Sequence, residues 1–338
     1  MLNQQTRNKI GCCVPEINSE DEVQKFNIVE KDKIKDFYSK NGFVVIKSLF
    51  DINICQQFRD AWDKEVKKYK GKIYRQTNAK LEKNFFNQQG WVMNPILNLQ
   101  SLDERKLPRL RSYFDLNIAD NKKLSELLEK LIGEKAKIVQ SMYFEGNSAT
   151  WEHQDSYYLD DEEIGTMVAG WIALEDIAAD AGRFFVCPKS HLEDYSEMNK
   201  DNVISDFHEK YIESIVNLIK SKNLKIVAPK LDKGDILLWN SLTIHGSLNS
   251  QSKVNSRSSI TFHAIRTSSN FLILRNILKK CKPEMNYEIH LFRPKDMNRF
   301  RNRIIYFFES KSPKTFYKIK DFTIRFLINN FSRKTKFR

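Results

Sequence analysis

The chain has 338 residues, of which 41% are hydrophobic and 29% charged, and this balance excludes a protein that is disordered throughout. Its length suffices for one sizeable domain with additions or for two small domains. The net charge of +13 lies in the last part of the chain, because residues 270–338 hold 18 Lys and Arg against 5 Asp and Glu, whereas the first 269 residues are neutral as a whole.

The first part of the sequence predicts helices around one strand. Residues 1–30 have the pattern of an irregular lead-in, and residues 71–120 show a mixed pattern that predicts no definite element. The β-branched run Phe43–Ile46, directly after Gly42, predicts a strand. The expected helices are Lys31–Lys40, a helix capped by Asp51 with Ile54, Phe58, Ala61, Trp62 and Val66 at helical spacing, and Lys122–Ile132 before Gly133.

From Lys135 the pattern changes to short β-type runs that are separated by Gly, Pro, Asn and Ser. The expected strands are Ala136–Phe144, Thr166–Leu174, Arg183–Val186, Leu224–Val227, Asp235–Trp239 and Ser258–Ile265. One helix, over about Asn202–Ile219, interrupts them. Many short strands of this kind predict a closed or sandwiched all-β core, with the N-terminal helices packed outside it.

An H-x-D motif, His153-Gln154-Asp155, is the first candidate for a metal site. In an extended segment, residues two apart project to the same side, so the imidazole and the carboxylate can reach one ion. His245 follows a predicted strand and can supply a third ligand. Two His and one carboxylate on one face of an octahedral ion leave open positions, which favours iron(II) over zinc.

Arg257 lies twelve residues after His245, at the head of the predicted strand Ser258–Ile265. A guanidinium inside a barrel is a costly buried charge unless a carboxylate meets it as a bidentate partner. The distal carboxylate of 2-oxoglutarate is a suitable partner.

With these residues in place, the sequence resembles the phytanoyl-CoA dioxygenase family of iron(II)/2-oxoglutarate oxygenases from about Lys31 to Arg266. The similar segments are GFVVIKSLF (42–50), WEHQDSYY (151–158), GWIALEDIAADAGRFFVCPKSH (170–191) and GDILLWNSLTIHGS (234–247), followed by Arg257. The resemblance implies a mainly β fold, a double-stranded β-helix (jelly roll, cupin-like), over residues 31–269, with flanking N-terminal helices and a basic helical C-terminal extension over residues 270–338.

The resemblance also implies roles for individual residues. His153, Asp155 and His245 would ligate iron(II), and Arg257 with Ser247 would hold the far carboxylate of 2-oxoglutarate. The co-substrate-binding set is completed by Gln140, which matches a co-substrate contact, and Trp171, which matches an aromatic position beside the co-substrate.

The implied reaction is hydroxylation of a C–H bond in a small metabolite, sugar or lipid-linked substrate, with O₂ consumed and succinate and CO₂ released. Asp155 favours hydroxylation over halogenation, because a small residue replaces this carboxylate in related halogenases. Desaturation and ring closure stay open.

Tyr157, Tyr158 and Arg183 flank the metal segments and are candidates for the substrate pocket, although tyrosines on strands commonly serve packing alone. His263 lies at even spacing from Arg257, so it is expected to face the barrel interior, where a histidine is more often a core residue than a functional one.

The sequence departs from the family pattern at two places. Glu145 stands where many members have Lys, and this puts the polarity of the substrate or co-substrate region in question. Pro188-Lys189-Ser190-His191 lacks the glycine that precedes the Ser-His pair elsewhere, a change expected to affect a turn.

The extension from residue 270 interleaves Phe, Tyr, Ile and Leu with Lys and Arg. This pattern predicts an amphipathic helix that makes peripheral contact with anionic lipid, the alternative being a solvated basic helix that packs on the body. Nucleic acid is a poor candidate partner because no recognisable binding motif accompanies the charge.

The five cysteines are scattered and fit neither a disulfide framework nor a C-x-x-C metal motif. Met1 is followed by polar residues, unlike a secretory signal peptide, and no apolar stretch has the length of a membrane-spanning helix. We therefore expect a cytoplasmic protein, peripheral to the inner membrane surface if the extension binds lipid. The alternative to an oxygenase is a catalytically silent jelly-roll module that its basic tail tethers to a membrane or a partner.

Overall fold

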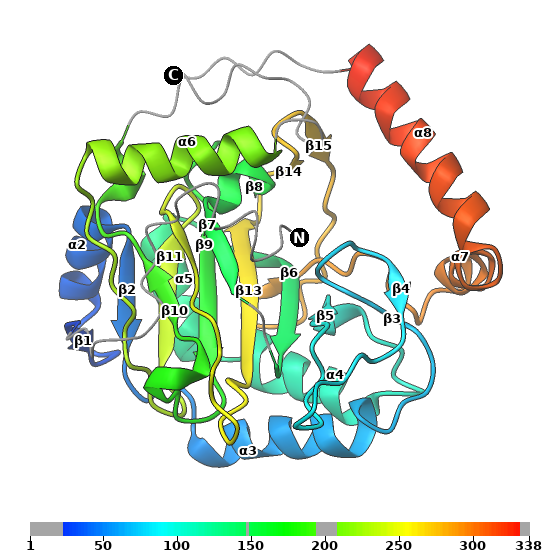
Figure 1. The fold of residues 1–338 in the computed structure, drawn as a ribbon, viewed down its shortest axis with the longest axis horizontal. Helices are drawn as coiled ribbons and strands as arrows, with labels where there is room; N and C mark the ends of the chain where they lie inside the picture. Colours follow the sequence, from blue (N-terminus) through cyan, green and yellow to red (C-terminus); the bar gives the residue numbers. More distant parts are fainter. Residues whose placement is uncertain (1–22, 147–148, 194–207, 332–338) are drawn as a thin grey trace.

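The structure is a computed structural model, and it describes residues 23–146, 149–193 and 208–331 (Figure 1). Its α-helices are α2 (Lys31–Asn41), α3 (Ile52–Ala61), α4 (Pro108–Phe114), α5 (Lys122–Ile132), α6 (His208–Ser221), α7 (Phe300–Lys311) and α8 (Pro313–Phe331). Two π-helical segments, η1 (Trp62–Val66) and η3 (Asp115–Ala119), extend α3 and α4. Short 3₁₀ turns are η2 (Leu99–Ser101), η4 (Asp155–Tyr157), η5 (Ala179–Ala181) and η6 (Ser190–Leu192).

The strands form one large and several small sheets. The large sheet runs in the order β1 (Lys25–Phe26), β2 (Phe43–Ile46), β11 (Ile236–Asn240), β9 (Val168–Ala173), β13 (Ser259–Arg266), β6 (Ala136–Phe144) and β16 (His290–Leu291), and β5 (Ile96–Leu97) also pairs with β6. The small sheets are β10 (Phe184–Val186), β12 (His245–Ser247) and β7 (Thr150–His153); β15 (Ile277–Lys279), β14 (Phe271–Ile273) and β8 (Leu159–Asp161); and β3 (Ile73–Tyr74) with β4 (Leu81–Glu82). This strand-rich architecture, flanked by helices, agrees with the predicted jelly roll.

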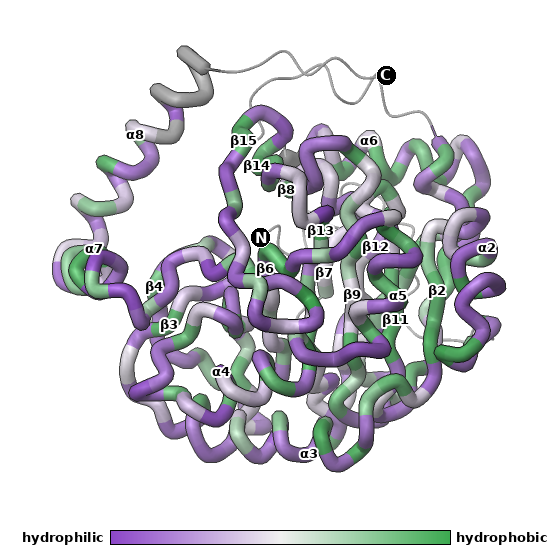
Figure 2. Tube along the Cα trace, turned by 180° about the vertical axis from the view of Figure 1, so that it is seen from behind, coloured by the Kyte–Doolittle hydropathy of each residue, from purple (hydrophilic) through white to green (hydrophobic). Residues whose placement is uncertain are grey.

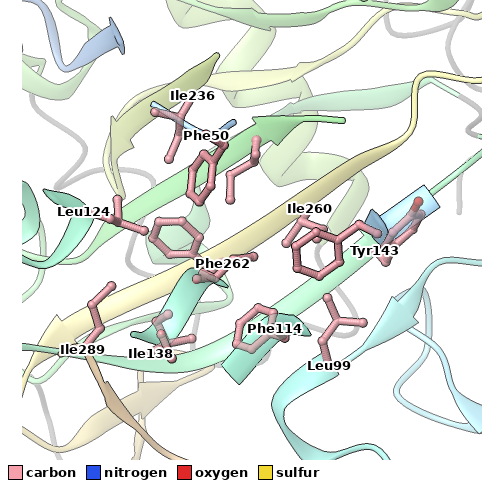
Figure 3. Packing of buried hydrophobic residues seen from close by; sticks show 14 of the residues in the cluster. Phe50, Leu99, Phe114, Leu124, Ile138, Tyr143, Ile236, Ile260, Phe262 and Ile289 are labelled. Carbon is pink, nitrogen blue, oxygen red and sulfur yellow. The ribbon is translucent and has the colours of Figure 1, made fainter. Parts of the chain in front are cut away.

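The outer face of the large sheet holds the main core. Alternate residues of β13, Ile260 and Phe262, pack with Phe114 of α4 and Leu124 of α5, and Figure 3 shows these side chains converging between the strands and the helices. The N-terminal helices therefore cover one face of the large sheet, on which alternate residues of each strand lie.

The inner face of the same sheet is lined by the intervening residues. Trp171 of β9 and Leu237 and Trp239 of β11 pack with Val186 of β10, so the small β10–β12–β7 sheet closes over this face. Ser259, Thr261 and His263 of β13 lie at the positions between its core residues. These polar side chains of β13 therefore lie on the inner face of the sheet.

Local signals placed most helix boundaries correctly. The Asp51 side chain accepts a hydrogen bond from Asn53 N at the start of α3, and Gly42 and Gly133 end α2 and α5 in the left-handed conformation. The expected strand Leu224–Val227 is wrong, because only Val227 makes a bridge, to Val186. Pro229 follows two residues later and lacks the backbone N–H that a longer ladder needs.

The C-terminal extension differs from the helical segment expected from residue 270. It begins with strands, since β14 pairs with β8 and β16 pairs in parallel with β6, and only then continues into α7 and α8. The strands β14 and β16 form by pairing with β8 and β6. The charge pattern of the extension does not predict such pairing. Figures 1 and 2 show α7 and α8 at one side of the molecule, with α8 projecting away from the sheets.

None of the helices that the structure describes combines the length and the apolar composition that crossing a membrane requires.

Candidate metal and co-substrate site

The H-x-D motif lies where β7 ends. His153 is the last residue of β7, Gln154 keeps an extended backbone (φ −112°, ψ 138°), and Asp155 begins the turn η4. The extended Gln154 puts the side chains of His153 and Asp155 on the same side, as expected, although the strand itself ends two residues before Asp155. Gln154 N donates to Tyr211 Oη at 2.9 Å, which fixes the turn.

His245 reaches the same place from β12, whose register sets it directly opposite His153 of β7. The centroids of the two imidazole rings are 4.3 Å apart. Asp155 Oδ1 lies 3.4 Å from His245 Nε2 and 3.9 Å from His153 Nε2, and one ligand atom from each of the three residues lies within 4.8 Å of the others. The cluster is therefore compact enough to surround one ion.

Both imidazoles are oriented by the protein backbone. His153 Nδ1 lies 2.7 Å from the carbonyl oxygen of Trp151, and His245 Nδ1 lies 2.9 Å from that of Thr243. A carbonyl oxygen only accepts, so each Nδ1 carries a proton, and in the neutral ring each Nε2 presents its lone pair to the cluster. This is the tautomer that a metal ligand needs.

The second carboxylate oxygen of Asp155 has its own partners. Trp239 Nε1 donates to Asp155 Oδ2 at 2.8 Å, and His263 Nε2 lies 3.3 Å from the same oxygen. Burial opposes ionisation of Asp155, but the imidazoles of His245 and His263 hold its pKa well below its ordinary value. Asp155 is thus an anion whose Oδ1 faces the two other ligands while Oδ2 is held from behind.

The strand register explains how two side chains reach Oδ2. Trp239 of β11, Ala169 of β9 and His263 of β13 are neighbours in one row across the inner face. The middle residue has only a methyl group, which leaves room for the larger side chains on either side of it. Sequence spacing predicted that His263 faces inward, but neither its approach to Asp155 nor the role of Trp239 was foreseen, because both depend on which strands pair.

Arg257 is buried in the same interior, at the entry to β13. Its Nη1 donates to the carbonyl oxygen of Gly182 at 2.8 Å, whereas its Nε has no hydrogen-bond partner, and no carboxylate within the described residues forms an ion pair with it. Burial lowers the pKa of Arg257 to about 9. Its backbone is left-handed (φ 64°), a strained conformation for a non-glycine residue.

A buried guanidinium with an unused donor fits a carboxylate ligand that the chain does not supply. The donor set of two imidazoles and one carboxylate likewise fits iron(II). Both groups implied by the sequence therefore match what the residues offer.

The other predicted co-substrate residues lie around this interior. Ser247 is buried on β12, and its Oγ is 3.0 Å from Thr150 Oγ1. Trp171 is buried on β9 with its ring centroid 6.0 Å from the Arg257 guanidinium carbon. Gln140 of β6 is the register partner of His263, so it shares the inner face with that residue.

The three candidate substrate residues are not equivalent. Tyr158 makes an edge contact with the His153 ring at 5.9 Å, so it borders the metal cluster. Tyr157 stacks on Tyr211 of α6 at 3.5 Å and belongs to an apolar cluster beneath that helix. Arg183 is buried and donates from Nε to the carbonyl oxygen of Ile177 at 3.4 Å.

Both departures from the family pattern have a local explanation. The Glu145 carboxylate pairs with Lys67 Nζ at 2.5 Å and accepts from Val92 N at 2.7 Å, so its charge is satisfied within the body. Lys189, in the position where a glycine was expected, adopts φ 68° before the turn η6. The second departure is thus confined to a turn, as predicted.

Comparison with known proteins agrees with this geometry. The family model described as phytanoyl-CoA dioxygenase (PhyH) matches residues 38–259. The peroxisomal phytanoyl-CoA dioxygenase of Bos taurus is 23% identical over 262 residues, which cover 73% of this chain and 71% of that protein.

Two solved structures share the fold. The non-haem alpha-ketoglutarate-dependent carbocyclase SnoK from nogalamycin biosynthesis matches with a TM-score of 0.54 and 18% identity, covering 74% of this chain and 89% of that one. The epimerase SnoN, in complex with Fe³⁺, alpha-ketoglutarate and nogalamycin RO, matches with a TM-score of 0.50 and 15% identity over 72% of this chain and 86% of that one.

Proposed function

The chain belongs to the phytanoyl-CoA dioxygenase family and is an iron(II)- and 2-oxoglutarate-dependent oxygenase, and from that premise we propose which residues carry the activity. His153, Asp155 and His245 hold iron(II), and Arg257 with Ser247 holds the distal carboxylate of 2-oxoglutarate. Gln140 and Trp171 flank the co-substrate.

The observation that supports this assignment best is that the three metal-ligand residues and a buried guanidinium with an unused donor lie in the same interior. Three ligand atoms converge with their lone pairs facing one another, and a buried guanidinium nearby has a donor without a partner. A single metal-bound dicarboxylate satisfies both.

The bound metal and co-substrate supply the oxidising power for attack on a C–H bond, with 2-oxoglutarate converted to succinate and CO₂. The chain's own residues orient and shield this centre. The backbone carbonyls of Trp151 and Thr243 fix the two imidazoles, Trp239 fixes the carboxylate of Asp155, with His263 Nε2 3.3 Å from the same oxygen, and burial of Asp155 and His245 keeps bulk water from the ligands.

We assign hydroxylation of a small metabolite, a sugar or a lipid-linked substrate as the reaction. The Asp155 carboxylate occupies the ligand position that a halogenase leaves free for halide. Tyr158, which borders the metal cluster, is the best placed of Tyr157, Tyr158 and Arg183 to contact the substrate.

A catalytically silent module is the competing function, and a direct assay separates the two. Wild-type protein with iron(II), O₂ and 2-oxoglutarate should release succinate above the background of the Asp155→Ala variant, even without the physiological substrate. Equal release by both proteins would favour the silent module.

We further propose that α7 makes peripheral contact with an anionic membrane surface. Phe300, Ile304, Phe307 and Phe308 lie on one helical face and are exposed, with Arg299 and Arg301 beside them. An apolar stripe with basic neighbours is typical of helices that lie on anionic lipid.

Sedimentation with phosphatidylglycerol vesicles tests this contact. The double variant Phe307→Ser/Phe308→Ser should remain in the supernatant, while Phe85→Ser, which removes an aromatic side chain that is 66% exposed elsewhere on the surface, should sediment like wild type. Failure of the wild type to sediment would end the lipid proposal without touching the oxygenase.

A further inference from the structure

A cavity of about 370 Å³ lies where the C-terminal extension meets the body. Its walls come from β3, β4, β5, η2 and residues 102–107 on one side and from residues 294–306 on the other. Figure 1 shows β3, β4 and α7 on the same side of the molecule. This volume is within the range of small-molecule sites in proteins.

The inside of the cavity is apolar. Ile73, Leu97, Leu102, Leu107 and Met297 line it, and each of these side chains is at least nine-tenths buried. Water gains few hydrogen bonds against such walls, so the space favours a hydrocarbon.

The lining also carries an excess of positive charge, with five cationic side chains against the single carboxylate of Asp103. Asp103 is already paired with Arg105 at 2.7 Å, and Lys295 lies 3.6 Å from Glu309. Lys72, Lys106 and Arg303 have no ion-pair partner in the parts of the chain that the structure describes, and Lys72 Nζ donates to the carbonyl oxygen of Ser310 at 3.0 Å. Arg303 inside the cavity and the exposed Lys106 at its edge are therefore the cations that can meet an anion.

Unsatisfied polar atoms point to the same conclusion. Ser101 is 5% exposed, and its Oγ has no hydrogen-bond partner among the described residues. Arg303 Nε and Asn98 Oδ1 are likewise buried without one. Buried polar atoms of this kind normally have partners, and three of them around one cavity indicate a ligand.

Two residues of the lining are also strained. Asn98 and Lys295 adopt φ of 61° and 55°, a conformation that side-chain-bearing residues rarely take and that is enriched where ligands bind. Burial lowers the pKa of Lys295 to about 8, although Glu309 opposes this shift.

We propose that this cavity binds a single acyl chain with an anionic headgroup, the chain against the apolar walls and the headgroup at Lys106 and Arg303. A purely polar anion would leave the apolar walls in contact with water, and a neutral hydrocarbon would leave Lys106 and Arg303 without an ion-pair partner. The cavity shares no lining residue with the metal cluster or with Arg257, so this site is separate from the oxygenase centre.

Calorimetric titration of the full-length protein with dodecyl phosphate, below its micelle concentration, tests the proposal. We expect saturable binding at one site. Dodecanol, which has the chain without the charge, and inorganic phosphate, which has the charge without the chain, should each bind at least tenfold more weakly.

Variants locate the binding. The double variant Lys106→Gln/Arg303→Gln removes the unpaired charges, and Met297→Trp fills the cavity; each should weaken binding of dodecyl phosphate at least tenfold. Lys123→Gln, a charge change on the exposed face of α5, is the matched control and should bind like wild type. The Lys106→Gln/Arg303→Gln variant should keep the wild-type rate of 2-oxoglutarate turnover.

Three results would overturn the proposal: no binding of dodecyl phosphate to wild type, equal binding by wild type and both cavity variants, or dodecanol binding as tightly as dodecyl phosphate. Two further arms identify the source of the ligand. Dodecanoate in solution represents a free fatty acid, and phosphatidylcholine vesicles containing lysophosphatidic acid represent a membrane lipid. Preferential uptake from either supports the site, and uptake from neither counts against it.

Discussion

The hydrogen bond from Trp239 to Asp155 is the feature of the metal site that is most open to a clean perturbation. Trp239→Phe removes the indole N–H but keeps an aromatic ring to pack against Phe184 and His245. A buried hydrogen bond to a charged group contributes about 2 kcal/mol, and loss of such a metal-orienting contact typically weakens metal affinity by about 10–100-fold.

The expected loss is at the lower end of that range. The Trp239 bond to Asp155 forms before the metal binds, so part of its energy is common to both states. His263 also remains on Oδ2 in the variant. We therefore expect iron(II) affinity to fall about tenfold.

Competition with a chromophoric chelator under anaerobic conditions measures this affinity. Trp62→Phe is the matched control, because Trp62 is equally buried, stacks on Tyr143 away from the metal cluster, and has an indole N–H without a hydrogen-bond partner in the described structure. Equal iron(II) affinity in the Trp239→Phe, Trp62→Phe and wild-type proteins would refute the role assigned to Trp239.

Other predictions concern Arg257 and Lys189. Arg257→Ala should weaken binding of 2-oxoglutarate to the metal-loaded protein by about 100-fold, equivalent to about 3 kcal/mol, because it removes one partner of a buried charge pair. The affinity for iron(II) should stay the same. Calorimetry that shows unchanged 2-oxoglutarate affinity would place the carboxylate elsewhere. Burial lowers the pKa of Arg257 to about 9, so the guanidinium is fully charged well below pH 9 and loses its charge above it. The dissociation constant of 2-oxoglutarate should therefore rise about tenfold by pH 10. A dissociation constant that stays the same from pH 7.5 to 10 would contradict this. Lys189→Gly should raise the free energy of unfolding by about 1 kcal/mol, because glycine adopts φ 68° without steric cost; a denaturant titration in which the variant is less stable would show that the lysine side chain matters more than its backbone.

Much of the fold could be predicted because its signals are local. The caps at Asp51 and Gly133 and the long β-type run Ala136–Phe144 each depend on a few adjacent residues, and the structure has all three as expected. Residues 71–120 could not be predicted, since β3, β4 and β5 are two-residue strands that exist only through their partners.

The site shows the same division. His153, Asp155 and His245 were found from motif spacing and family resemblance, and the structure brings them together. Trp239 looked like a strand residue of the core, and its bond to Asp155 follows only from the pairing of β11, β9 and β13. The cavity beside α7 was invisible to sequence reasoning because its two halves are about 200 residues apart.

The central claim is that one metal ion and one 2-oxoglutarate molecule join the three ligands to Arg257. A crystal structure of the protein with manganese(II), as a stand-in for iron(II), and 2-oxoglutarate tests it most directly. We expect the ion between His153 Nε2, His245 Nε2 and Asp155 Oδ1, with the distal carboxylate of 2-oxoglutarate on the Arg257 guanidinium. An ion bound elsewhere, or a carboxylate that leaves Arg257 unpaired, would contradict the account.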